Sequence, residues 1–250
     1  MSQITRMSRL SKAGLYLTGL AMVFLTTTAH ASSPDVGLVT SLTGEVSFWN
    51  TTDQKEPAQA QAFMKVRQGD HFKLSPGSQV QLLYCVSGRQ ETWTGPATFS
   101  AGDQKGQAVD DKKPQAPPVV KIVPSRVSKR IMEAPIPFPR DTIRYSGVIQ
   151  TMTPKYIPAV PPATLSPEAR LQISKAEAVY RDLQKEAEPG DLTPELYLLS
   201  VYADYGQYAK MEKVIDAMRE KQPGNATLKE LKAWVQNLSL KSATDPAKKR

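Results

Sequence analysis

The sequence predicts a chain of two folded parts, a small antiparallel β domain followed by an all-α domain. Residues 36–100 contain short runs rich in β-branched and aromatic residues, separated by turn pairs every 8–10 residues. This spacing is typical of a small β-sandwich or rolled barrel. Residues 101–165 hold eleven of the 20 prolines. Residues 166–240 carry the breaks of helical hairpins and two N-cap signals, Ser166 before Pro167 and Thr193 before Pro194. The predicted fold class is therefore multidomain, β then all-α.

The chain divides into five predicted segments. They are a signal peptide at 1–31, a β domain at 36–125, a basic Pro-rich linker at 126–165, a helical domain at 166–240 and a basic disordered tail at 241–250. The run "VVKIV" (119–123) is expected to add an edge strand to the β domain, and "DTIRYSGVI" (141–149) is a weaker strand candidate.

The N-terminus has the order of a secretory signal peptide. Arg6, Arg9 and Lys12 precede an uncharged, mostly apolar run at 13–25, and small residues follow. We predict cleavage between Ala31 and Ser32, which leaves an exported chain with no stable membrane span. An uncleaved anchor is the alternative, but a span needs roughly 20 apolar residues and this run is shorter.

"QGDHFKL" at 68–74 raises the question of a catalytic or metal site. Gly69-Asp70 suits a tight turn into a strand, and His71 is the only histidine left after cleavage. Cys85 is the only cysteine, so neither an internal disulfide nor a Cys-x-x-Cys metal site can form. We therefore predict a structural His71 and no catalytic residue, metal or cofactor, while a site made of carboxylates alone stays open.

The positive charge lies mainly outside the predicted domains. Residues 36–100 are neutral, residues 103–165 carry a net charge of +5, and residues 166–240 carry −2. The overall charge of +8 therefore comes from the linker, the tail and the signal peptide. With no strongly basic folded part, we expect no nucleic-acid partner.

The β segment resembles the FecR-type domain of bacterial cell envelopes. The matching residues are, in order, Val39, Gly44 and Val46, then Gly69-Asp70, Gly77-Ser78 and Ser87-Gly88. The family has Asp-Gly at the last turn, where this chain has Ser-Gly. The resemblance implies a β domain in the periplasm of a Gram-negative bacterium. FecR-type signalling also needs a cytoplasmic segment and a transmembrane helix, which a cleaved chain lacks.

The helical segment resembles tetratricopeptide repeats. "PGDLT" (189–193) recurs as "PGNAT" (223–227) after 34 residues, the period of that repeat. The residues that match the repeat are Leu198, Tyr202, Gly206, Tyr208, Ile215 and Pro223. Three positions depart from it, since Leu199, Met211 and Met218 replace small residues. A generic helical hairpin is the alternative.

The resemblance to tetratricopeptide repeats implies a partner-binding groove on the helix expected at about 194–205. Side chains one turn apart share a face, so we predict that Leu196, Ser200, Ala203 and Asp204 line the groove. With fewer than two full units the groove is short, which predicts weak binding or dimerisation. The alternative is that this face packs on the β domain or the linker.

These features together predict a non-enzymatic periplasmic protein that acts as a protein-interaction module or scaffold. The alternatives are a FecR-type signalling component and an envelope protein that binds peptidoglycan or another polysaccharide. The sequence names no partner.

Overall fold

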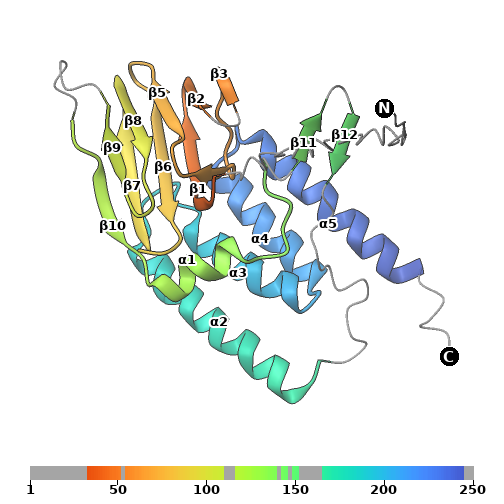
Figure 1. Ribbon diagram of the computed structural model, residues 1–250. Coiled ribbons are helices and arrows are strands. Elements are labelled where there is room, and N and C mark those ends of the chain that lie inside the picture. Colours follow the sequence, from red (N-terminus) through yellow and green to blue (C-terminus); the bar gives the residue numbers. More distant parts are fainter. Residues whose placement is uncertain are drawn as a thin grey trace, which may run out of the picture. The chain divides into compact units, whose positions relative to one another are not determined.

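The computed structural model describes residues 33–51, 54–109, 116–139, 142–145, 148–151 and 165–244, all of which belong to the unit Ser32–Arg250. The predicted cleavage site between Ala31 and Ser32 lies outside them. Two antiparallel five-stranded sheets precede four long helices (Figure 1). The coarse prediction of β followed by α is therefore confirmed. No helix formed by the described residues has the length and apolar character that crossing a membrane requires.

Sheet A has the strand order β10-β7-β6-β1-β4. Its strands are β1 (Asp35–Thr43), β4 (Lys65–Arg67), β6 (Gln79–Tyr84), β7 (Arg89–Thr94) and β10 (Val119–Ile122). The expected strand at 119–123 is thus present, and it lies at the edge of the sheet.

Sheet B has the order β3-β2-β5-β8-β9. Its strands are β2 (Val46–Asn50), β3 (Gln54–Gln59), β5 (His71–Leu74), β8 (Ala97–Ala101) and β9 (Gly106–Ala108). The weaker strand candidate is a hairpin of β11 (Thr142–Tyr145) and β12 (Val148–Thr151).

The two sheets enclose one apolar core. Strands β2 and β8 alternate between buried and half-buried residues, as expected when only one face of a sheet is covered. Strands β1 and β6 are instead buried almost continuously, because both faces of sheet A are covered. Phe72 and Phe99 stack between the sheets with ring centroids 5.1 Å apart.

The Gly-Asp turn predicted before β5 is confirmed. Gly69 has a φ of +84°, a left-handed conformation that favours glycine. The carboxylate of Asp70 is fully buried and accepts hydrogen bonds from the backbone N–H of Arg67 and the side-chain amide of Asn50, both at 2.8 Å. The acidic side chain therefore serves the turn that starts the strand.

The C-terminal helices are α2 (Pro167–Glu186), α3 (Thr193–Asp204), α4 (Tyr208–Lys221) and α5 (Ala226–Thr244), and each packs against the next. Ser166 caps α2 as predicted, since its hydroxyl accepts a hydrogen bond from the N–H of Ala169. The start of α3 differs from the prediction, because the carboxylate of Asp191 accepts the N–H of Thr193 and Thr193 itself is already helical.

Part of the predicted linker is folded. Residues 125–132 form the helix α1 (Ser125–Met132), although residues 126–165 were expected to be a Pro-rich linker. Val127 and Ile131 lie one turn apart and are fully buried, and Ile136 and Phe138 beyond the helix are buried as well. Four apolar side chains outweigh the flanking prolines, which limit the helix to about two turns.

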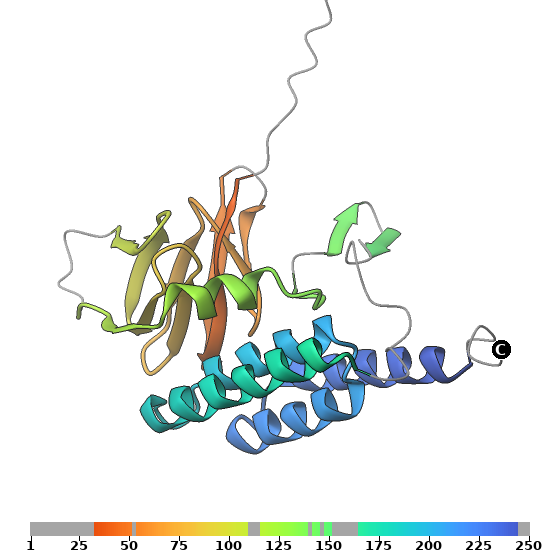
Figure 2. The same ribbon diagram turned by 90° about the horizontal axis from the view of Figure 1, so that it is seen from below.

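Helix α1 brings the β and α parts into one apolar core. Val127 and Ile131 share a cluster with Leu38 and Leu83 of sheet A and with Leu196 of α3. Figure 2 shows α1 between the strands and the C-terminal helices. The expectation of two folded parts separated by a linker is therefore wrong for residues 126–139.

The tail prediction is also wrong for residues 241–244, because α5 continues to Thr244. The rest of the predicted tail, 245–250, lies outside the described residues.

Candidate partner-binding surface

Helix α1 covers the face on which the sequence predicts a groove. Leu196 and Ser200 are 0% exposed and Ala203 is 4% exposed. Asp204, the fourth predicted residue, pairs with Arg130 of α1. Burial raises the pKa of the Asp204 carboxyl above its usual value, and the nearby Arg130 offsets only part of this rise. Three of the predicted residues are therefore core residues in this structure, as in the alternative that the face packs on the linker. Leu198 and Tyr202 are buried as expected.

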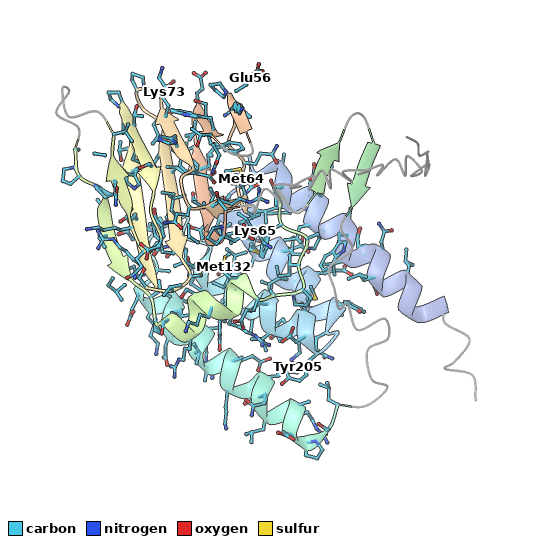
Figure 3. All side chains as sticks on the ribbon, in the orientation of Figure 1. Glu56, Met64, Lys65, Lys73, Met132 and Tyr205 are labelled. Carbon is cyan, nitrogen blue, oxygen red and sulfur yellow. The ribbon has the colours of Figure 1, made fainter. Side chains whose placement is uncertain are left out.

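The position of α1 is fixed by polar as well as apolar contacts. The hydroxyl of Ser128 donates a hydrogen bond to the carbonyl oxygen of Cys85 at 2.8 Å, which ties the helix to the turn after β6. Met132, at the end of α1, and Tyr205, just after α3, pack against the shared core and are labelled in Figure 3. The covered groove is thus part of the folded core.

A polar cluster joins sheet A to the start of α3. The side-chain amide of Gln90 donates to the Asp191 carboxylate at 3.1 Å and to the Thr193 hydroxyl at 2.9 Å, and all three residues are buried. Lys121 of β10 donates to the carbonyl oxygen of Glu186 at 2.6 Å and lies 3.9 Å from the Asp191 carboxylate. Every member has a partner, so the cluster fixes the helices on the sheet.

A second polar cluster lies among the helices. Glu195 of α3 is fully buried, and its Oε1 atom lies 2.8 Å from Nζ of Lys221. The hydroxyl of Tyr180 and the amide of Gln184 also donate to this oxygen. Burial and the charge of Glu195 together raise the pKa of Tyr180 to about 12, so its hydroxyl stays a donor at neutral pH. The other oxygen, Oε2, has no hydrogen-bond partner among the described residues.

Both clusters are internal contacts of the fold. Within the described residues there is no group of three or more His, Cys, Asp or Glu side chains arranged to hold a metal ion. Asp191 joins sheet A to the start of α3, and Glu195 joins α3 to α2 and α4. The first cluster therefore stabilises the junction between the sheet and the helices, and the second stabilises the packing of the helices.

The two edges of sheet A differ. The edge strand β4 carries Lys65 and Arg67, both paired with Asp35, and such charged residues protect an edge from further pairing. The opposite edge strand, β10, exposes three apolar side chains, with Val119 64%, Val120 40% and Ile122 65% exposed. Among the residues that the structure describes, no strand pairs with the outer side of β10. It is an open and apolar edge.

A shallow hollow with room for about one water molecule adjoins this edge. It lies between the end of β10 and the helices α2 and α3. Its lining residues are Lys121, Ile122, Val123, Pro124, Leu183, Glu186, Asp191, Thr193 and Pro194. We call β10 and this hollow the edge site. The sequence predicts the strand but not the hollow, because the residues on its two sides lie far apart in the chain.

The outer face of sheet B carries a pair of half-buried rings. His71 begins β5 and stacks on Trp49 of β2, with ring centroids 5.2 Å apart and ring planes 15° apart. Ser100 lies opposite His71 on β8, and Lys73 lies between Ser47 and Thr98 (Lys73 is labelled in Figure 3). The Nδ1 atom of His71 is buried under the stack and has no hydrogen-bond partner among the described residues. His71 thus packs on an aromatic ring, in keeping with its predicted structural role.

Comparisons with protein-family models, with curated proteins and with solved structures return no match to this chain. The resemblances to FecR-type domains and to tetratricopeptide repeats therefore depend on the sequence patterns alone.

Proposed function

We propose that this chain is an exported, non-catalytic protein of the bacterial cell envelope that binds a partner protein. The signal-like order of residues 1–31 supports export to the periplasm. The turn pattern of the β part and the 34-residue period of the helical part support a FecR-like domain joined to tetratricopeptide-like helices. Modules of both kinds bind other molecules without catalysing a reaction on them.

The observation that carries this proposal is the edge site. An apolar edge strand invites pairing with other chains, and folded proteins protect such edges when they have no partner for them. The edge at β4 is protected by paired charges, whereas β10 is short, carries one charged residue, Lys121, and leaves Val119, Val120 and Ile122 exposed. This apolar edge is the surface that a partner of this protein would cover.

Site-specific crosslinking in the envelope tests the proposal. A photo-reactive residue in place of Val119 is expected to give discrete crosslinked species with an envelope protein, in a chain whose mass shows that it starts at Ser32. The same residue in place of Leu171, which is 53% exposed on α2, is the matched control and is expected to give none. A full-length chain retained in the membrane, or equal crosslinking at both positions, would contradict the proposal.

The face around Trp49 and His71 favours a second candidate function, the binding of a polysaccharide such as peptidoglycan. The half-buried ring of Trp49 offers a flat apolar surface to the C–H face of a sugar. Ser47, Thr98 and Ser100 place hydroxyl groups, and Lys73 an ammonium group, on the same face of the sheet. This arrangement has the mixture of aromatic and polar groups that orients a sugar ring.

Cosedimentation with purified peptidoglycan tests this second function. If the face binds glycan, Trp49→Ala is expected to lower the bound fraction about tenfold, because the stacking surface is lost. Trp234→Ala, which removes a half-buried tryptophan from α5, is the control and is expected to bind like the wild type. A wild-type chain that stays in the supernatant, or a Trp49→Ala variant that still sediments, would exclude this function.

A further inference from the structure

Two rows of side chains run across the strands of sheet B on its outer face. Residues directly opposite each other on neighbouring strands lie on the same face of a sheet. One row consists of Trp49, His71, Ser100 and Gln107. The next row consists of Gln59, Ser47, Lys73 and Thr98. The apolar residues between them belong to the core between the sheets, and the C-terminal helices pack on sheet A (Figure 1). The two rows therefore form a surface that no described helix covers.

Lys73 is the only lysine, arginine, aspartate or glutamate in these two rows. It is exposed, and it lies on β5, the central strand of the sheet. Lysine on an edge strand protects that edge from further pairing, but a lysine on a central strand has no edge to protect. Among the described residues no carboxylate pairs with the Lys73 ammonium. This face thus presents one positive charge that the fold does not neutralise.

The charge lies beside the stacked rings. Successive side chains on one face of a strand are about 7 Å apart, which is the spacing from His71 to Lys73 along β5. Trp49 stacks on His71 and is the diagonal neighbour of Lys73 on β2. The ammonium group of a lysine stands on a flexible stem of four carbons. A sugar ring that stacks on Trp49 therefore has its substituents within reach of the Lys73 ammonium.

We propose that this face binds an acidic polysaccharide, in which a sugar unit carries a carboxylate group as a hexuronic acid does. This inference rests on the polysaccharide-binding function proposed above and specifies its substrate class. The ring of Trp49 supplies the apolar contact, and the ammonium of Lys73 supplies a charge-assisted hydrogen bond to the sugar carboxylate. Ser47 and Ser100, which flank the rings and the lysine, supply hydroxyl groups to the sugar hydroxyls.

The charge of Lys73 determines the selectivity of this face, because neutral and acidic sugars stack equally well on an aromatic ring. A neutral sugar gains the contact with Trp49 alone, whereas an acidic sugar also gains an ion pair. Solvent screens charges at an exposed surface, so this pair contributes modestly and weakens as salt is added. We therefore expect a preference of about fivefold for the acidic sugar at low ionic strength.

Fluorescence polarisation with the mature full chain tests the proposal. The probes are labelled α-1,4-tetragalacturonate and α-1,4-tetragalactose, which differ only in the carboxylate or hydroxymethyl group that each sugar unit carries. The acidic probe is expected to bind about fivefold more tightly at low ionic strength. This difference is expected to disappear at about 1 M salt, where charges more than about 3 Å apart are screened.

Substitutions at Lys73 isolate its charge. Lys73→Gln is expected to bind both probes with the affinity that the wild type has for the neutral probe, and Lys73→Arg is expected to recover the preference. Lys175→Gln removes an exposed lysine from α2 and is the matched control with an unchanged preference. Trp49→Ala is expected to weaken the binding of both probes, because both stack on the ring. Circular dichroism shows that each variant is folded.

Three results would overturn the inference. One is equal binding of the two probes by the wild type, and another is a preference that a folded Lys73→Gln variant retains. The third is binding of the acidic probe that Trp49→Ala leaves unchanged, which would assign the binding to charge alone. If both probes bind equally and Trp49→Ala weakens both, polysaccharide binding stands and selection by Lys73 is wrong. If neither probe binds up to millimolar concentration, the inference falls, and cosedimentation with peptidoglycan decides whether the second function stands.

Discussion

Replacing Lys221 by methionine is expected to lower the free energy of unfolding by about 3 kcal/mol. The substitution leaves the carboxylate of Glu195 fully buried without its counter-charge, with only Tyr180 and Gln184 as donors. Chemical denaturation followed by circular dichroism measures the change. Adding Glu195→Gln to the Lys221→Met variant is expected to restore most of the lost free energy of unfolding, because it removes the buried charge.

A second lysine–glutamate pair provides the matched control. Lys210 and Glu177 also lie 2.8 Å apart, but the side chain of Glu177 is 31% exposed whereas that of Glu195 is buried. Solvent screens an exposed pair, so Lys210→Met is expected to cost about 1 kcal/mol or less. Equal losses for Lys221→Met and Lys210→Met would show that burial does not decide the strength of these pairs.

Ile131→Ala is expected to destabilise the β and helical parts together, by about 3 kcal/mol. Ile131 is fully buried in the cluster that joins sheet A, α1 and α3, and truncation leaves a cavity that the neighbouring elements cannot close. Two of the three tryptophans, Trp49 and Trp93, lie in the β part. Tryptophan fluorescence and far-ultraviolet circular dichroism, to which the helices contribute most, are expected to report one common unfolding transition.

Leu171→Ala is the control for this substitution, because Leu171 is 53% exposed on α2 and its truncation leaves no cavity. It is expected to change the stability by less than about 0.5 kcal/mol. If Ile131→Ala leaves the stability unchanged, or if the two signals show separate transitions, residues 126–139 act as a linker after all.

Local patterns in the sequence predict local structure well in this chain. The turn at Gly69-Asp70, the cap at Ser166 and the strand at 119–123 each depend on neighbouring residues, and each is present. The edge position of β10 was also predictable, because a short apolar run between prolines has no room for a central strand.

The features that sequence patterns missed depend on contacts between distant residues. Val127 and Ile131 have helical spacing, but only two such residues in a Pro-rich tract give too weak a signal to predict α1. Gln90 and Asp191 are 101 residues apart in the chain, and no local pattern connects them. The covering of the predicted groove was missed for the same reason. Periodicity assigns Leu196 and Ser200 to one face of a helix, but it does not show that α1 packs on that face.

The helical cover of sheet A is completed late in the synthesis of the chain. Leu38 and Leu83 pack against α1 and α3, and α3 begins at Thr193, 71 residues after the last strand of the sheet ends at Ile122. At a translation rate of about 5–20 residues per second, the part of this apolar face that α3 covers stays uncovered for roughly 4–14 s after the strands have been made. During that interval the nascent β part exposes an apolar surface, which is the kind of surface that a chaperone of unfolded chains binds. The order of the elements along the chain thus makes early folding depend on protection until the helices arrive.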